Sequence, residues 1–289
     1  MSLRLMLLTP APDEPRFAAI AQEWADRIAA SLGLAGIMAE THCWTEADDL
    51  SGFDGVSPLL AWSYHQHPAA WVARLAALGA SGLAVVNPAG LLLWNTTKTY
   101  LADIEACGVP IVPTLFVDQV TPAALAEAHE RFGGELIAKP QVSGGSYATV
   151  RVTGGAVPPD GPQGPAMLQP FLPSITGEGE LSLLFFGGVF SHAVGKVAKA
   201  GDFRVQYQFG GTYGAITPPA EAFDVARQAL AAAGGGLTYA RIDLIRDTEG
   251  RLRLMELEAI EPDLYLEHAP DGGLAFARAM RRTLEENLP

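Results

Sequence analysis

Strand-like segments alternate with helix-like segments through the first 90 residues, and this order restricts the fold more than any other feature of the chain. Leu3–Thr9 is a mostly apolar run that predicts a buried strand, and residues 14–32 have the spacing of an amphipathic helix. Residues 36–42 and 82–87 predict further strands, with a helix over 68–78 between them. Strands that alternate with helices imply a parallel sheet that is covered on both faces.

From Leu91 onward the chain mixes strands, helices and glycine-rich turns. The proline- and glycine-rich segment 154–165 cannot form a regular element and is either a linker or an exposed loop. We therefore expect an α/β protein in three parts, 1–90, 91–166 and 167–289. The elements expected in the second and third parts are helices over 96–108, 122–132 with Thr121 as its cap, 220–233 and 273–288, and strands over 135–140, 148–152, 167–171, 181–186 and 189–197.

Composition excludes several classes of function. The formal net charge of −13 argues against nucleic acid or an anionic membrane surface as partner, although a few local cations can still bind a phosphate. Cys43 and Cys107 have no paired spacing, which indicates neither a disulfide framework nor structural zinc. No segment has the pattern of a secretory signal or a membrane span, so we expect a cytoplasmic protein. A homodimer is the default expectation for its assembly.

The carboxylates of residues 241–258 form the most informative chemical pattern. Two strands flank a turn at 247–250, and a four-residue turn at 248–251 would pair Asp243 with Glu256. Period-two alternation would place Leu252, Leu254, Glu256 and Glu258 on one face. Like charges opposite each other are destabilising unless a cation lies between them, and three carboxylates without a Cys or His cluster suit Mg²⁺. The alternative is a solvated acidic hairpin.

Two segments could bind phosphate. The strand that ends in Lys139 and Pro140 is followed by the Ser-Gly-Gly-Ser sequence of residues 143–146, whose backbone N–H groups and hydroxyls could fold over phosphates. Lys98 lies at the expected start of a helix, where the helix dipole favours anions. Taken singly, the glycine pair could be an ordinary turn and Lys98 a surface lysine.

The later half of the chain supplies further candidates. The apolar strand ending in Gln169 and Pro170, followed by Phe171 and Leu172, could bond the edge of an adenine ring, although plain core packing is the alternative. Residues 202–211 mix charged and aromatic residues with a flexible Gly-Gly pair, which indicates a loop that can close over a substrate. The cations expected near the carboxylates are Lys196, Lys199, Arg204 and Arg241.

In this order, the segments resemble the ATP-grasp superfamily, specifically the carboxylate–amine ligases of the glutathione synthetase and ribosomal-protein glutamate ligase type. The resemblance runs from about Leu91 to Leu266. Sequences around Trp94–Leu101 and Phe190–Val194 are similar to those of the O-ureido-serine cyclo-ligase family of cycloserine biosynthesis. The resemblance implies an N-terminal parallel-sheet domain followed by two α+β subdomains that enclose ATP, with the phosphate lid in the second part and the metal and substrate sites in the third.

The resemblance also implies an ADP-forming carbon–nitrogen ligase that joins a small-molecule or peptide carboxylate to an amine through an acylphosphate. Asp243, Glu256 and Glu258 would hold two Mg²⁺ ions, and Arg204, Arg241 and Lys196 would be catalytic. The ATP contacts implied are Lys98, Lys139, Ser143, Gly144, Gly145, Ser146, Gln169, Pro170, Phe171, Leu172 and Glu180, the last of them to the ribose. The substrate contacts implied are Arg204, Gly210, Gly211, Trp62, Tyr64 and His65.

Two departures from the cyclo-ligase pattern bear on the substrate. Ser63 replaces an aspartate of a Trp-Asp-Tyr-His segment, and Leu59 replaces the arginine before it. We therefore expect little cyclisation of O-ureido-serine and amide formation on a different acid. The rival functions are a small-molecule kinase on the same fold and a nucleotide-binding regulator without catalysis.

Overall fold

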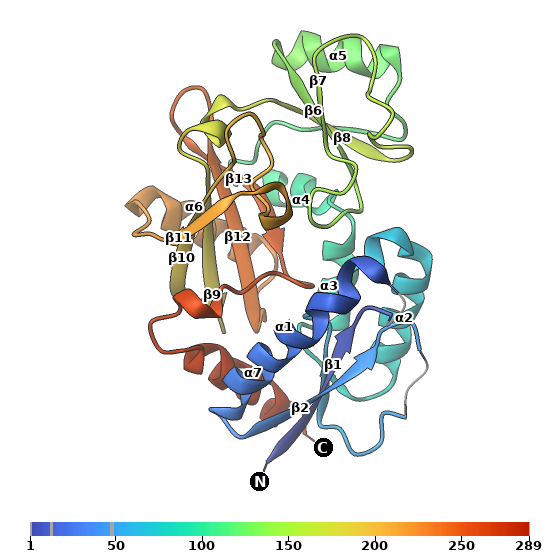
Figure 1. Cartoon of the computed structure of the whole chain (residues 1–289), viewed down its shortest axis with the longest axis vertical. Coiled ribbons are helices and arrows are strands. Elements are labelled where there is room, and N and C mark those ends of the chain that lie inside the picture. The colour runs from blue at the N-terminus through green and yellow to red at the C-terminus, as the bar shows by residue number, and fades with distance from the viewer. Residues whose placement is uncertain (1, 12–13, 47–48, 289) are drawn as a thin grey trace.

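The computed structural model describes residues 2–11, 14–46 and 49–288, which form three sheets (Figure 1). The N-terminal sheet has the order β2-β1-β3-β4 and is parallel throughout. Its strands are β1 (Leu3–Thr9), β2 (Ile37–Cys43), β3 (Gly55–Ser57) and β4 (Ala84–Val85). The predicted parallel sheet is therefore confirmed.

Helices cover both faces of this sheet, as the alternation of β1 requires. Leu5 and Leu7 pack in a cluster with residues of α1 (Pro15–Gly33) and α7 (Leu274–Glu286). Met6 and Leu8 face the other way, into a cluster with residues of α2 (Pro68–Ala80) and α3 (Ala89–Thr96). The last helix of the chain thus completes the core of its first domain, so the boundaries expected from the sequence do not separate the hydrophobic cores.

The small sheet is antiparallel, with the order β5-β8-β6-β7. It consists of β5 (Leu115–Val117), β6 (Leu136–Pro140), β7 (Val150–Val152) and β8 (Ala166–Pro170), and it forms a separate lobe with α5 (Pro122–Phe132) at the top of Figure 1. The Thr121 side chain accepts a hydrogen bond from the Ala124 amide at 3.1 Å, so this predicted helix cap is confirmed. Since β8 pairs with β5 and β6, most of it lies on the small-sheet side of the boundary expected at residue 166.

The large sheet has the order β11-β10-β9-β12-β13. Its strands are β9 (Glu180–Phe186), β10 (Val189–Val197), β11 (Thr212–Ala215), β12 (Tyr239–Arg246) and β13 (Leu252–Glu258), and α4 (Tyr100–Ala106) and α6 (Ala220–Ala232) supply residues to the core on one face. Short 3₁₀ turns are η1 (Tyr64–Gln66), η2 (Pro173–Thr176), η3 (Tyr207–Phe209) and η4 (Leu266–His268). None of the helices in the described residues is long and apolar enough to cross a membrane.

A helix is expected over 96–108, and its expected start is wrong. Thr96 ends α3, Thr97 has extended backbone (φ −107°, ψ 122°), and α4 begins at Tyr100. The break lets the Lys98 amide donate to the carbonyl of Gln141 at 2.7 Å, a bond to the small lobe that a continuous helix would prevent. Lys98 therefore lies between two helices.

Candidate active site

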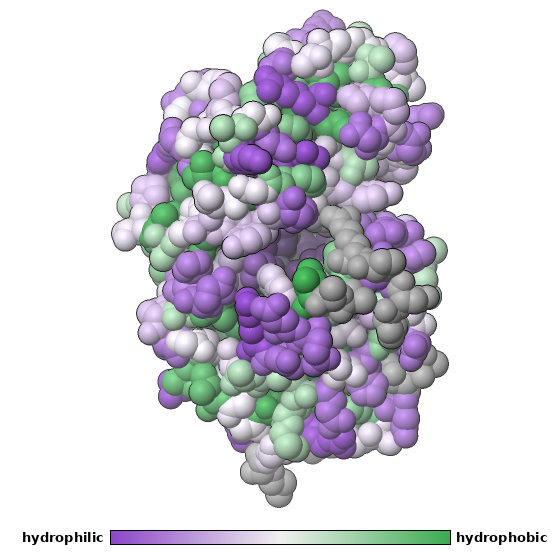
Figure 2. All heavy atoms as spheres, in the orientation of Figure 1, coloured by the Kyte–Doolittle hydropathy of each residue, from purple (hydrophilic) through white to green (hydrophobic). Residues whose placement is uncertain are grey.

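A cavity of about 440 Å³ lies where the three parts of the chain meet. Residues from all three sheets or from their connecting loops line it. Figure 2 shows a hollow near the middle of this face of the molecule, below the small lobe. The cavity gathers most of the residues singled out in the sequence.

A β-bulge positions the carboxylates. Asp243 on β12 pairs with Glu256 on β13, as predicted, but the reason differs. Next to the turn the register differs by one residue from the expected one, because Arg246 pairs with Leu252 and the Asp247 amide donates to the Arg251 carbonyl. An irregularity between Asp243 and Leu244 restores the expected register. Met255 is the extra residue of this bulge, which places two residues of one strand against one of the other.

The bulge also corrects the predicted faces. Leu252 and Leu254 pack in the core beneath the sheet, and Leu257, not Glu256, continues that apolar row. Glu256 and Glu258 line the cavity on the opposite face, together with Asp243. The expectation that Leu252, Leu254, Glu256 and Glu258 share one face is wrong, because the extra residue inverts the alternation.

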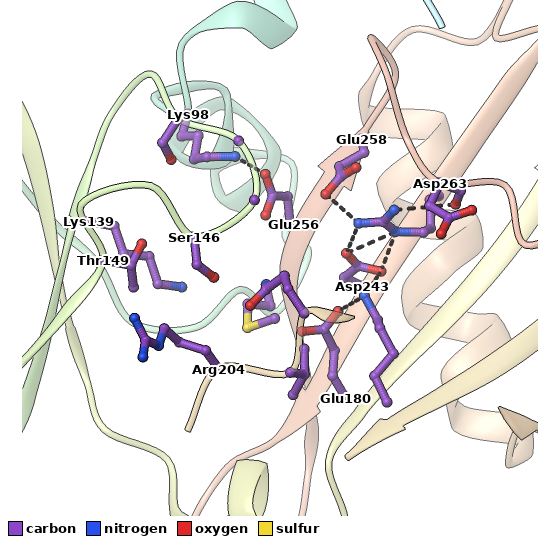
Figure 3. A pocket seen from close by; sticks show the side chains of 18 of the residues that line it. Lys98, Lys139, Ser146, Thr149, Glu180, Arg204, Asp243, Glu256, Glu258 and Asp263 are labelled. Atoms are coloured by element: carbon purple, nitrogen blue, oxygen red, sulfur yellow. Dashed lines mark hydrogen bonds and ion pairs between the residues drawn. The ribbon is translucent and has the colours of Figure 1, made fainter. Parts of the chain in front are cut away.

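The three carboxylates can together hold a cation. One oxygen from each of Asp243, Glu256 and Glu258 lies within 4.8 Å of the others. Hard oxygen ligands of this kind suit Mg²⁺. Each carboxylate also faces a basic side chain: Lys98 bonds Glu256, and Arg241 bonds both Asp243 and Glu258 (Figure 3).

Lys196 connects Asp243 to a second buried carboxylate. Its amine bonds Glu180 and lies 3.4 Å from Asp243 Oδ1, and the Ser182 hydroxyl donates to the same oxygen. Burial raises the pKa of Glu180 to about 7, although Lys196 opposes the shift. Burial also acts to raise the pKa of Asp243, but Arg241 and Lys196 overcome it and hold that pKa below its usual value. Asp243 thus remains an anion at neutral pH.

Lys98 and Lys139 both reach the cavity from the side opposite most of the carboxylates (Figure 3). Burial and the neighbouring charge of Lys98 lower the pKa of Lys139 to about 8. Burial also lowers the pKa of Lys98, against the attraction of Glu258, Glu261 and Asp243. Two ammonium groups that repel each other in a buried place form a binding site for a polyanion.

The loop of residues 143–146 lies over the cavity beside these lysines. Gly145 adopts a left-handed backbone (φ 56°), and its carbonyl accepts a hydrogen bond from the Gln208 side chain at 3.1 Å. Tyr147, directly after the loop, lies with its ring centre 5.0 Å from that of His65, the two rings being tilted by 52°. The loop therefore touches both the N-terminal domain and the loop that follows β10.

Arg204 is held in place before any ligand binds. Its guanidinium donates to both carboxylate oxygens of Asp202, at 3.1 and 2.8 Å, and stacks 3.7 Å from the centre of the Phe209 ring. Arg204 lines the cavity. Asp202 and Phe209 thus fix the orientation of the Arg204 guanidinium.

An apolar slot extends the cavity at the end of β8. It is lined by Met167, Gln169, Pro170, Phe171, Leu172, Val112, Ile137, Ile245 and Met255, of which Leu172, Val112, Ile245, Phe171 and Met255 pack in one apolar cluster. The Phe171 amide donates to the carbonyl of Glu135 at 2.8 Å, whereas the Leu172 amide makes no hydrogen bond with the described residues. The Gln169 side chain is itself bonded to Thr114 at 2.9 Å. Leu172 thus offers the slot a main-chain donor.

Trp62, Tyr64 and His65 line the cavity, as does Ser63. Leu59 does not: it is 1% exposed and packs in the core cluster of the N-terminal sheet. Position 59, where this chain departs from the cyclo-ligase pattern, therefore lies in the core and not at the cavity.

Gly210 and Gly211 do not line the cavity either. Gly211 lies against the main chain of Val205, whose carbonyl oxygen would be 1.8 Å from a Cβ at position 211. Within this loop the backbone at Gly211 therefore packs directly against the backbone of Val205. The expectation that Gly210 and Gly211 contact a substrate is not supported.

Sequence reasoning missed a group on the segment after β13. Glu261, Asp263 and Tyr265 line the cavity, together with Trp24 of α1 and Tyr213 of β11. Burial, reinforced by Glu258, raises the pKa of Glu261 to about 8, and burial raises that of Asp263 to about 7. The density of acidic residues directly after Glu258 was a usable signal, whereas nothing in the sequence places the aromatic residues together.

Comparisons with known proteins identify relatives of this chain. Residues 6–87 match the family described as the N-terminal domain of the D-cycloserine synthetase DcsG. The cycloserine biosynthesis protein DcsG of Streptomyces lavendulae is 29% identical over 273 residues, which cover 86% of this chain and 90% of that protein. The crystal structure of DcsG matches with a TM-score of 0.82 at 28% identity, over 97% of this chain and 99% of that one.

More distant structures share the fold. D-alanine–D-alanine ligase from Bacillus anthracis matches with a TM-score of 0.73 at 14% identity, over 99% of both chains. The ATP-grasp ligase PsnB in complex with a minimal precursor matches with a TM-score of 0.66 at 17% identity, over 98% of this chain and 100% of that one. The chain has the fold of the ATP-grasp ligases. It is a homologue of DcsG over most of its length.

Proposed function

We propose that this ATP-grasp ligase joins a carboxylic acid to an amine at the expense of ATP, releasing ADP and phosphate. The observation that carries the proposal is the division of one cavity into a cationic side, with Lys98, Lys139 and Arg204, and a carboxylate side, with Asp243, Glu256 and Glu258. Such a division suits the transfer of a phosphoryl group, which proteins catalyse mainly by positioning and by electrostatic stabilisation.

The nucleotide would be bound by the chain's own polar and apolar groups. The slot at the end of β8 is apolar and offers the Leu172 amide, which suits a purine base. Lys98 and Lys139 would bind the α- and β-phosphates, and the loop of residues 143–146 would cover them. Glu180, which pairs with Lys196 at the cavity floor, would face the ribose.

Asp243, Glu256 and Glu258 would hold Mg²⁺, as their oxygen donors and spacing allow. Bound there, the metal would supply positive charge to the phosphates. Arg241 bonds two of these carboxylates and so orients them towards the cavity.

The reaction would proceed in two displacements. An oxygen of the substrate carboxylate attacks the γ-phosphorus, and the bond to ADP breaks to give an acylphosphate. The amine nitrogen then attacks the acyl carbon, the bond to phosphate breaks, and the nitrogen loses a proton as the amide forms. Arg204, Arg241 and Lys196 would neutralise the charge that develops on the transferred group. An assay of ADP release with hydroxylamine as the trapping amine tests this sequence.

The lowered pKa of Lys139 makes ATP binding sensitive to pH. Its pKa of about 8 means that the amine loses its charge as the pH rises through that value, so ATP affinity should fall between about pH 7 and about pH 9.5. We expect Lys139→Ala to weaken ATP binding about tenfold at pH 7 and to remove most of this pH dependence. Calorimetric titration with ATP measures both effects.

The matched control for Lys139 is Lys199→Ala, because Lys199 is exposed and does not line the cavity. This variant should bind ATP like the wild type. An unchanged affinity in Lys139→Ala would contradict the phosphate contact.

A further inference from the structure

Two carboxylates in the cavity lie outside the proposed metal site. Glu261 makes no hydrogen bond or ion pair with any residue that the structure describes. The Asp263 carboxylate accepts a hydrogen bond from the Tyr265 amide at 2.9 Å and forms no ion pair with the described residues. Arg241 donates to the main-chain oxygen of Asp263 at 3.3 Å and, with Lys196, attracts its carboxylate from a distance. Burial raises the pKa of both carboxyl groups, and a cationic ligand beside them would favour their ionised forms and be attracted by them.

The basic side chains that attract Glu261 and Asp263 are Lys98, Arg241 and Lys196, and all three are already bonded. Lys98 is bound to Glu256, Arg241 is bound to Asp243 and Glu258, and Lys196 is bound to Glu180 and lies beside Asp243. A ligand carboxylate placed beside Glu261 would therefore find no available cation among these groups, and it would raise the pKa of Glu261 still further. This end of the cavity accepts a positive group and rejects a negative one.

Aromatic side chains line the same region. Trp24, Trp62, Tyr213 and Tyr265 belong to one apolar cluster, although they come from four separate segments of the chain. Trp24 and Trp62 meet edge to face at 5.4 Å, and Tyr213 and Tyr265 do so at 5.4 Å. These four residues are called the aromatic wall below. Aromatic rings bury apolar surface and attract cations to their faces.

The carboxylate of Glu261 also adjoins the phosphate loop. A Cβ at Gly144 would lie 3.2 Å from Glu261 Oε1 and 3.4 Å from His65 Nδ1. A positive group held by Glu261 would therefore lie beside the loop that is proposed to cover the phosphates. That is the place from which an amine could reach the activated acyl carbon.

We propose that the amine substrate is an aromatic monoamine without a carboxylate, whose ammonium group is bound by Glu261 and whose ring lies against the aromatic wall. This inference rests on the proposed ligase function and names the class of its second substrate. It makes Glu261 and Trp62 residues that determine specificity.

Matched pairs of small molecules test the charge preference directly. Each pair is an aromatic amino acid and its decarboxylated amine: phenylalanine and phenethylamine, tyrosine and tyramine, tryptophan and tryptamine. In calorimetric titrations of the full chain with Mg-ADP present, we expect at least one amine to bind at least about tenfold more tightly than its amino acid. Amino acids that bind as well as their amines, or a lack of saturable binding by all three amines, would overturn the proposal.

Variants assign the preference to residues. Glu261→Gln should weaken binding of the preferred amine about tenfold while leaving its weak amino acid partner unaffected or slightly improved. Trp62→Leu should weaken the binding of that amine more than it weakens the binding of methylamine. Glu267→Gln removes an exposed charge from the same segment and should leave amine binding unchanged. Equal loss in Glu261→Gln and Glu267→Gln would contradict a specific contact.

These binding measurements need no turnover, so they separate the inference from the proposed function. Amine binding without any ATP-dependent ligation would retain the inference and refute the ligase. Ligation of an amino acid acceptor, with the KM for that acceptor unchanged in Glu261→Gln, would retain the ligase and refute the inference.

Discussion

Glu256→Gln should reduce the rate of ADP release about 100- to 1000-fold, the loss that follows removal of one group stabilising transition-state charge. Glu256 lies opposite Asp243 and bonds Lys98, so its carboxylate belongs to both sides of the cavity. Glutamine keeps the size and one acceptor oxygen but removes the charge. We expect ATP affinity to change much less than turnover, as measured by calorimetry and a coupled ADP assay.

Glu249→Gln is the control for this variant, since Glu249 lies in the exposed turn before β13 and pairs with Arg251. Its turnover should match that of the wild type. Wild-type turnover in Glu256→Gln, with the melting temperature unchanged, would remove Glu256 from the mechanism.

Asn87→Ala should cost about 4 kcal/mol of unfolding free energy, because it leaves several buried main-chain groups without partners. Asn87 is fully buried, and its side chain bonds the carbonyls of Tyr239 and Ala259 at 3.0 and 2.8 Å. It also accepts from the amides of Thr238 and Tyr239 at 2.6 and 3.4 Å. One side chain thereby joins the end of the N-terminal sheet to the large sheet.

Asn287→Ala gives the matched comparison, since the exposed Asn287 bonds only the carbonyl of Thr283, one turn earlier in its helix. Urea unfolding should show a loss below about 1 kcal/mol for this variant. A loss of the same small size in Asn87→Ala would mean that the two sheets do not depend on this side chain.

The pairing of Asp243 with Glu256 could be predicted from the sequence, but the face that they occupy could not. Beside the turn, β12 and β13 pair one residue away from the expected register, and the bulge shifts the pairing back by one residue. Asp243 and Glu256 therefore pair as expected. The alternation of side chains between the two faces is nevertheless changed, because the extra residue Met255 places Glu256 on the cavity face and not on the core face. A bulge depends on packing from both sides of the sheet, which a local pattern does not contain.

Residues that contact each other across the fold were also beyond sequence reasoning. Leu59 replaces an arginine of the cyclo-ligase pattern, yet it packs in the core, while its near neighbour Ser63 lines the cavity. The aromatic wall unites four segments without a common spacing. By contrast, the strands and helices of the N-terminal domain followed their periodicity closely, because burial on a regular sheet repeats along the chain.

The most direct test of the proposed ligase is trapping of its intermediate by hydroxylamine. The purified chain is incubated with Mg-ATP, hydroxylamine and a panel of carboxylic acids that includes amino acids, dipeptides and ureido acids, and ADP and hydroxamate are both measured. We predict that at least one acid yields hydroxamate and ADP in equal amounts, and that Glu256→Gln abolishes both. ADP release accompanied by a stable phosphate ester and no hydroxamate, or no acid-dependent ADP release across the panel, would contradict an acylphosphate-forming ligase.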